Sequence, residues 1–157
     1  MLIYETEHFT LEAPEHPHIS RSDGGHIKIV NKDKKRDRLD LEPNELVELS
    51  WLTAISGQAF TNIMRKNGVN IEKINYQDNG NWCYINNKSP HMHVHIYGRT
   101  FDSQTQPLPN SLKFPLQSTG FYDGFEGLSQ KDVNDIALEI DKLSQTQKYD
   151  KTSWFFK

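Results

Sequence analysis

The chain has 157 residues, which suits one compact domain with a buried core. Charged residues make up 25% and hydrophobic residues 35%, which argues against disorder along the whole chain. The net charge of −3, with histidines counted as neutral, argues against a broad nucleic-acid-binding face. It still allows a site for one small phosphate ligand, which needs only a few donors.

The sequence carries no sign of a disulfide or of a membrane segment. A single cysteine, Cys83, excludes an intrachain disulfide and a metal site built from several cysteines. No apolar run approaches the roughly 20 residues of a membrane-spanning helix. The first residues lack a basic segment followed by an apolar one. These features predict a cytoplasmic protein without a membrane partner.

The first part of the chain alternates between strand-forming residues and turns. β-branched and aromatic residues predict a strand over 2–9, and two prolines make the segment over 10–20 extended or irregular. Consecutive glycines at positions 24 and 25 predict a turn. A second strand is predicted over 26–30, followed by a charged, solvated loop over 31–40.

The middle of the chain predicts a long helix from Pro43 to about Asn67, since proline suits a first helical turn. Its apolar residues recur at spacings of three and four and form one stripe. They are Leu46, Leu49, Leu52, Ile55, Ala59 and Ile63. Two further strands are predicted over 69–77 and 82–85, separated by a turn.

The last part predicts a strand over 91–97, an irregular segment over 101–125 rich in Pro, Gly and Ser, and a final helix. Ser129, with Asp132 three residues later, opens that helix in the manner of a capping box. Strands and helices are segregated along the chain, which predicts an α+β fold with an antiparallel sheet and helices packed on one face.

The strand over 91–97 is the most unusual feature of the sequence. Successive side chains of a strand point to opposite faces. One face carries His91, His93, His95 and Tyr97. The other face carries Met92, Val94 and Ile96 and faces the core. Buried histidine is costly without a partner, so a core would not select three imidazoles in a row.

Three interpretations of the histidine face are open. The first is an exposed face that collects histidines without a function. The second is a metal site, in which two of the histidines bind zinc and a further ligand comes from elsewhere. The third is phosphoryl chemistry, in which one imidazole is the nucleophile and its neighbours set its tautomer and supply protons. Strict alternation beside a clean apolar face favours the third.

The segment 90–99, PHMHVHIYGR, resembles the signature of the histidine-triad family, in which three histidines alternate with apolar residues. Segment 23–29, DGGHIKI, is similar to that family's glycine-histidine strand, and segment 74–80, INYQDNG, resembles the strand and turn before its triad. The likeness runs over about 3–99. Segment 119–123, TGFYD, is similar to bacterial members labelled diadenosine tetraphosphate hydrolases.

The resemblance implies a single domain over 1–157, with a core over about 3–99 and an irregular segment and C-terminal helix over 100–157. It also implies a fold in which an antiparallel sheet has a long helix packed on one face, with a C-terminal helix. Family members are commonly homodimers, so we expect a homodimer. The aromatic residues 154–156 are expected to pack on the domain or on a second copy.

The resemblance also implies a role for each of four histidines. His93 would attack the α-phosphorus of a nucleotide, its ring held by a hydrogen bond to a backbone carbonyl within the triad. His95 would protonate the leaving group or donate to a phosphate oxygen. His91 and His26 would support the network and its tautomers. The alternative for these two is a buried pair with satisfied hydrogen bonds.

Four further residues are expected to bind substrate. Gln77 matches an amide position near the phosphate, and Ser89 lies just before the triad, with Lys88 as the alternative donor. Asn79 lies in the turn beside them. His18 stands eight residues before His26, where relatives place Asn or Asp on the ribose. The alternative for His18 is a surface histidine in a proline-rich edge.

The implied activity is that of a nucleotide phosphohydrolase or nucleotidyl transferase that forms a covalent nucleotidyl-histidine. Its substrate would be a dinucleoside polyphosphate or a nucleoside phosphoramidate. No cofactor and no protein-bound metal are expected, although a divalent cation can accompany a polyphosphate. Two alternatives from other classes are a nucleotide-binding sensor with little catalysis and a metal-binding protein.

Overall fold

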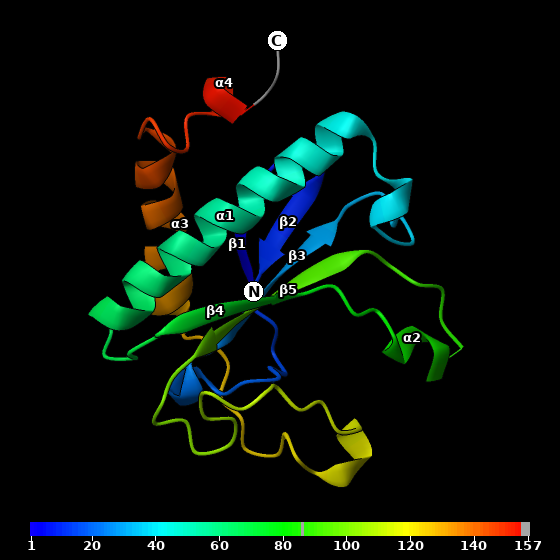
Figure 1. Ribbon diagram of the computed structural model, residues 1–157, viewed down its shortest axis with the longest axis vertical. Coiled ribbons are helices and arrows are strands. Elements are labelled where there is room, and N and C mark those ends of the chain that lie inside the picture. Colours follow the sequence, from blue (N-terminus) through cyan, green and yellow to red (C-terminus); the bar gives the residue numbers. More distant parts are fainter. Residues whose placement is uncertain (86, 155–157) are drawn as a thin grey trace.

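The computed structural model describes residues 1–85 and 87–154 (Figure 1). Within these residues the strands form one antiparallel sheet of five, in the order β1-β2-β3-β5-β4. The strands are β1 Leu2–Glu5, β2 Phe9–Glu12, β3 His26–Asn31, β4 Lys73–Gln77 and β5 His93–Arg99. The α-helices are α1 Pro43–Lys66, α2 Trp82–Ile85, α3 Gln130–Ser144 and α4 Lys151–Trp154. Short 3-10 turns lie at Arg21–Asp23, Arg38–Asp40 and Gln117–Thr119.

The two long helices begin where the sequence places their caps. Glu42, which precedes Pro43, and Glu45 in the first turn of α1 form a capping box. Ser129 and Asp132 form the capping box of α3. The Asp132 carboxylate also accepts two hydrogen bonds from the Arg21 guanidinium, at 2.6 and 3.0 Å. This pair ties α3 to the turn that leads into β3.

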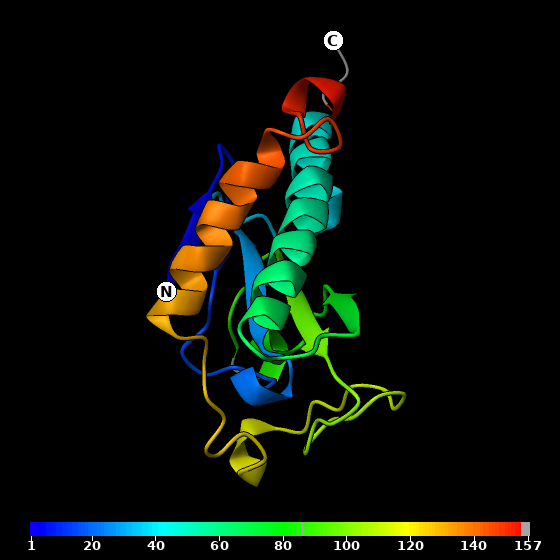
Figure 2. The same ribbon diagram turned by 90° about the vertical axis from the view of Figure 1, so that its left-hand side faces the viewer.

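The α1 and α3 helices pack on one face of the sheet (Figures 1 and 2). The apolar residues of the central strands point into this layer, and Ile27, Ile29, Val94 and Ile96 are all at most 2% exposed. Side chains of the same strands that point the other way include His26, His95 and Tyr97. The expected α+β architecture, with its antiparallel sheet and helices on one face, is confirmed. No described helix is both long and apolar enough to span a membrane.

Several predicted elements differ from the structure, and the strand predicted over 69–77 begins only at Lys73. The strand predicted over 2–9 is divided, because Thr6 turns the chain through hydrogen bonds with Phe9 and so forms a hairpin of β1 and β2. The strand predicted over 82–85 is instead the short helix α2, so β4 is an edge strand and pairs only with β5. The histidine strand begins at His93, so His91 lies just before β5.

The irregular segment after β5 is fastened to the sheet by two buried polar side chains. The Asp23 carboxylate accepts hydrogen bonds from the backbone amides of residues 104 and 105, at 3.1 and 3.2 Å. The Arg99 guanidinium donates to the backbone carbonyls of Gln106 and Asn110. Both side chains are at most 6% exposed. These contacts fix the start of the segment that covers the histidine face.

Candidate active site

The histidines of the central strands lie in contact. β3 and β5 are paired so that Lys28 lies opposite His95 and His26 lies opposite Tyr97. His26 Nε2 and His95 Nδ1 are 2.9 Å apart. The His93 ring meets the His95 ring edge-on, with 4.6 Å between the ring centroids. The strand register therefore brings three imidazoles from two strands into one network.

A backbone amide sets the tautomers of His26 and His95. The N–H of His18 donates to His26 Nδ1 at 3.2 Å, so the neutral His26 ring carries its proton on Nε2. That proton is donated to His95 Nδ1. The neutral His95 ring therefore carries its own proton on Nε2, where it is available to a ligand.

His93 is oriented by the backbone immediately before it. Its Nδ1–H donates to the carbonyl of His91 at 2.6 Å, so Nε2 keeps its lone pair. The His91 ring in turn donates from Nε2 to the carbonyl of Asn31 at 2.7 Å. A neutral imidazole with a free Nε2 can act as a nucleophile.

Burial keeps the inner histidines neutral. Burial lowers the pKa of His95 to about 2 and that of His18 to about 4, with smaller electrostatic contributions from neighbouring groups. Burial and the neighbouring histidines also hold the pKa of His26 well below 6.5. These rings are therefore neutral at pH 7, and His95 offers an N–H donor rather than an imidazolium.

We expect this network to make the fold sensitive to acid. His18, His26 and His95 have pKa values below their ordinary 6.5, so the unfolded state binds more protons below that pH. The free energy of unfolding should fall by up to about 1.4 kcal/mol per pH unit for each ring. The hydrogen bond to Glu48 raises the pKa of His8. This raised pKa changes the free energy of unfolding only above pH 6.5, so it does not offset the loss of stability in acid.

Urea unfolding at pH 7.0, 6.0 and 5.0 measures this dependence. The variant His18→Phe should reduce the slope below pH 6 by about one third, because it removes one of the three protonation sites. Equal stability of the wild-type protein at pH 7.0 and 5.0 would contradict the prediction.

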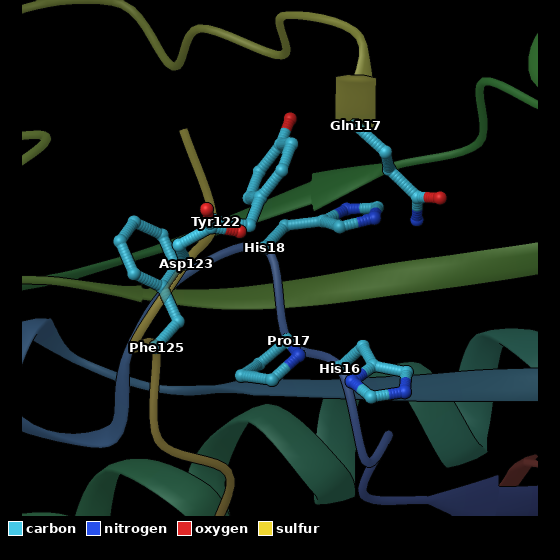
Figure 3. Close-up of a pocket in the computed structure, with 7 residues that line it drawn as sticks. All are labelled: His16, Pro17, His18, Gln117, Tyr122, Asp123 and Phe125. Atoms are coloured by element: carbon cyan, nitrogen blue, oxygen red, sulfur yellow. The ribbon is translucent and has the colours of Figure 1, made fainter. Parts of the chain in front are cut away.

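Three cavities surround the network. The first, here called the His93 cavity, has a volume of about 270 Å³ and is lined by Ser89, His91, His93 and His95 among others. The second, the Phe114 cavity, has about 330 Å³ and adjoins the first at His95. The third, the Tyr122 cavity, has about 190 Å³ (Figure 3). His18 lines all three cavities.

The Tyr122 cavity lies between two segments that are far apart in the sequence. Figure 3 shows His16, Pro17 and His18 from the segment before β3, and Gln117, Tyr122, Asp123 and Phe125 from the irregular segment after β5. The Tyr122 ring lies 5.6 Å from the His18 ring, measured between centroids. The cavity is therefore walled by aromatic and polar side chains together.

The structure brings the predicted substrate-binding residues to these cavities. Gln77 ends β4 opposite His95, and both it and Asn79 line the Phe114 cavity. Ser89 lines the His93 cavity, as does the alternative donor Lys88. For His18 the sequence left open a second interpretation, a surface histidine in a proline-rich edge, and this interpretation is wrong. Its ring stacks on His26 at 4.9 Å, and its Nδ1 lies 2.8 Å from the Tyr97 hydroxyl.

Sequence reasoning gave no role to four aromatic residues around the site. Tyr97 was visible through its alternation with the histidines, and its ring stacks on His95 at 5.5 Å. Trp82 begins the short helix α2, and Phe114 and Tyr122 lie in the irregular segment after β5. Each of the three rings is 5.3 to 5.6 Å from the His18 ring. No periodicity could have found these three, because tertiary contacts position their segments.

Two groups of described side chains could approach a metal ion. One consists of His18, His26 and His95, and the other of Glu7, His8 and Glu48. In the first group both ring nitrogens of His26 are already hydrogen-bonded, one to the His18 amide and one to His95. An ion would have to break this network. The geometry thus fits a hydrogen-bonded relay better than the zinc site considered from sequence.

The fold is shared with solved structures of histidine triad proteins. A histidine triad nucleotide-binding protein from Sulfolobus tokodaii has 15% sequence identity and a TM-score of 0.58, covering 92% of this chain and 85% of that chain. A zinc-bound histidine triad family protein from Mycobacterium smegmatis has 18% identity and a TM-score of 0.55, covering 91% and 85%. A uridylyltransferase has 13% identity and a TM-score of 0.54, covering 90% of this chain and 43% of its own.

No family model and no curated protein sequence matches the chain. The structural likeness at these low identities therefore defines the class of fold. The chain has the α+β fold of histidine triad proteins, as its sequence predicted. The histidine network described above lies on the sheet of that fold.

Proposed function

We propose that this protein is a nucleotide hydrolase or nucleotidyl transferase in which His93 is the nucleophile. The observation that carries the proposal is the 2.6 Å hydrogen bond from His93 Nδ1 to the His91 carbonyl. It fixes the tautomer in which Nε2 has a free lone pair, and His93 lines a cavity beside His95. No carboxylate is needed to orient the ring, because the backbone carbonyl does so.

In the first step His93 Nε2 attacks the α-phosphorus of a bound nucleotide. The N–P bond forms as the bond from phosphorus to the leaving group breaks, and the leaving group keeps the bonding electron pair. The imidazole ring becomes positively charged, while its proton stays on Nδ1 and remains hydrogen-bonded to the His91 carbonyl. His95 donates its Nε2–H to the departing atom or to a phosphate oxygen.

In the second step water or another acceptor attacks the same phosphorus. The N–P bond breaks, the ring recovers its electron pair, and the acceptor loses a proton to solvent. Ser89 and Gln77 line the cavities on either side of His95 and are assigned as donors to the phosphate oxygens. His26 holds the tautomer of His95, and His91 holds the backbone that orients His93.

The low pKa of His95, about 2, favours one kind of leaving group. A phosphate departs as an anion, for which a neutral N–H donor is sufficient. An amine must take a complete proton as it leaves. We therefore propose a dinucleoside polyphosphate as the substrate, as for a diadenosine tetraphosphate hydrolase, ahead of a nucleoside phosphoramidate. A divalent cation, where present, is bound by the polyphosphate of the substrate and not by a site on the protein.

The names of the structural neighbours support a nucleotide substrate. One neighbour is described as nucleotide-binding and another as a uridylyltransferase.

A homodimer and a cytoplasmic location are part of the same proposal. Light scattering in solution tests the dimer. Of the aromatic ending, Trp154 donates to the carbonyl of Lys148 at 2.7 Å, and residues 155–156 lie outside the described part of the chain.

The test is incubation with a panel of dinucleoside polyphosphates and nucleoside phosphoramidates, followed by mass spectrometry of quenched samples. The expected result is release of a nucleoside monophosphate and a nucleotidyl mass adduct on the peptide that carries His93. Tight binding of nucleotide without product over hours would favour the sensor alternative instead. A chelator could also abolish turnover. If one metal ion then restored turnover without any cation bound to the polyphosphate, this result would favour the metal-dependent alternative.

A further inference from the structure

A further cavity continues the His93 cavity on the side of His91. This cavity, here called the arginine cavity, has a volume of about 260 Å³, and its lining includes Arg36, Arg38 and Asp78. It shares three lining residues with the His93 cavity, which are Gly80, Asn81 and His91. The two cavities are therefore neighbours, and a ligand bound at His93 can extend into the second. The proposed chemistry at His93 does not use this space.

The two arginines lie on a loop that is tied to the histidine segment. Arg36 and Arg38 belong to the charged segment over 31–40, and their side chains are exposed. The carbonyl of Lys35 accepts a hydrogen bond from the amide of Met92 at 2.8 Å. Met92 immediately precedes the first residue of β5, His93. The backbone that carries the arginines is therefore fastened directly beside the proposed nucleophile.

The charges around the arginine cavity and the His93 cavity favour an anion. Histidines aside, the charged side chains that line them are three cations and two carboxylates, namely Arg36, Arg38, Lys88, Asp37 and Asp78. The Arg38 guanidinium lies 3.7 Å from the Asp78 carboxylate. The Asp37 carboxylate accepts a hydrogen bond from the amide of Leu39 at 2.7 Å. Among the described residues the Arg36 guanidinium forms no ion pair, so its charge is available to a ligand.

The cavity that adjoins the His93 cavity at His95 has a different character. Among its described lining residues, the Phe114 cavity has no Lys, Arg, Asp or Glu. A negatively charged group that extends from the phosphorus is therefore attracted towards the arginine cavity and not towards the Phe114 cavity. Arginine suits a phosphate group in particular, because its planar guanidinium can donate two parallel hydrogen bonds to the phosphate oxygens.

We propose that Arg36 and Arg38 bind the leaving group through its negative charges and make the enzyme selective for leaving groups that carry phosphates. This inference rests on the proposed function, and it gives a role to two residues that the chemistry at His93 does not involve. The guanidinium of Arg36 meets the charge directly, and that of Arg38 exchanges the Asp78 carboxylate for a phosphate. Both stabilise the negative charge that the leaving group gains as its bond to phosphorus breaks.

The experiment measures nucleotide binding to the His93→Ala variant by calorimetry, in the absence of divalent cations. AMP has only the α-phosphate, whereas ATP has two more phosphates that can reach the arginine cavity. In this background ATP should bind about tenfold more tightly than AMP, or better. Addition of Arg36→Gln should reduce the ratio of the two dissociation constants to about twofold and leave the dissociation constant of AMP unchanged.

Two further variants in the same background test whether the effect belongs to the arginine cavity. Asp78→Asn removes the carboxylate that competes for Arg38, so it should increase the preference for ATP by about twofold to threefold. Lys34→Gln removes one positive charge from the same loop, but Lys34 lines neither cavity, so the ratio should not change. All three side chains are exposed, and thermal unfolding confirms that the variants are folded. No effect of Arg36→Gln, or an equal loss in Lys34→Gln, would overturn the inference.

Turnover by the protein with His93 intact separates this inference from the proposed function. Arg36→Gln should lower kcat/KM for diadenosine tetraphosphate by about tenfold. It should leave kcat/KM for adenosine 5′-phosphoramidate unchanged, because ammonia carries no phosphate. An Arg36-dependent preference for ATP without any hydrolysis would remove the proposed function and leave the arginine site standing. Hydrolysis at His93 with equal dissociation constants for AMP and ATP would overturn the arginine site alone.

Discussion

Replacing His93 with alanine should abolish turnover while leaving the fold intact. The variant removes the only atom proposed to form a bond to phosphorus, and removal of a nucleophile costs roughly 10⁴-fold or more in kcat. His93 is half-buried, and its ring hydrogen bond is made to a backbone carbonyl two residues away. No buried partner in another element loses a hydrogen bond through that contact. Thermal unfolding should therefore give a melting temperature close to that of the wild-type protein.

The neighbouring variant His91→Ala provides the comparison. The group that orients His93 is the carbonyl of His91, which the alanine variant keeps. The lost interaction is the hydrogen bond from the His91 ring to the carbonyl of Asn31, at 2.7 Å. Loss of such a supporting contact costs roughly 10- to 100-fold in activity. Single-turnover kinetics on a dinucleoside polyphosphate measures both variants, and full activity of His93→Ala would rule out the proposed mechanism.

The sequence predicts the histidine strand well because its information is local. Alternation of His93 and His95 with Val94 and Ile96 follows directly from strand geometry, and the structure buries the apolar pair. The long helix and the capping box at Ser129 are equally local signals. These patterns predict the sheet, its helical layer and the shared face of the histidines.

The sequence does not predict what covers that face. The residues of α2 favour strands by composition, yet they form a short helix and leave β4 as an edge strand of the described sheet. Phe114 and Tyr122 reach His18 only because Asp23 and Arg99 anchor the segment after β5. The bond from Gln104 to Asp23 joins residues 81 positions apart, and a contact of this kind leaves no periodic pattern in the sequence.

Replacing Gly98, which lies in β5, with alanine should destabilise the protein strongly. A Cβ at Gly98 would lie 2.2 Å from the carbonyl oxygen of Gly24 and 2.7 Å from the side chain of Ile71. The obstacle is backbone, which is held in place by the hydrogen bond from the Gly98 amide to the Gly25 carbonyl at 3.1 Å. We expect a loss of about 3 kcal/mol or more in the free energy of unfolding.

Gly57 supplies a matched control, because a Cβ there meets a movable group. The nearest atom is the hydroxyl oxygen of Tyr76, at 2.1 Å, and Tyr76 is 46% exposed and can rotate towards solvent. Gly57 also lies inside α1, where alanine favours the helix by about 1 kcal/mol over glycine. The change Gly57→Ala should therefore alter the free energy of unfolding by less than about 1 kcal/mol.

Urea unfolding of both variants, with activity measured on the folded fraction, separates packing from chemistry. In Gly98→Ala the end of β5 must move away from Gly24, and this shift displaces the neighbouring Tyr97 from His26 and His18. Activity per folded molecule should fall together with stability, whereas Gly57→Ala should keep both. A neutral Gly98→Ala variant would mean that the strand and the glycine turn are not in close contact, and the register that joins His26 to His95 would then lose its structural basis.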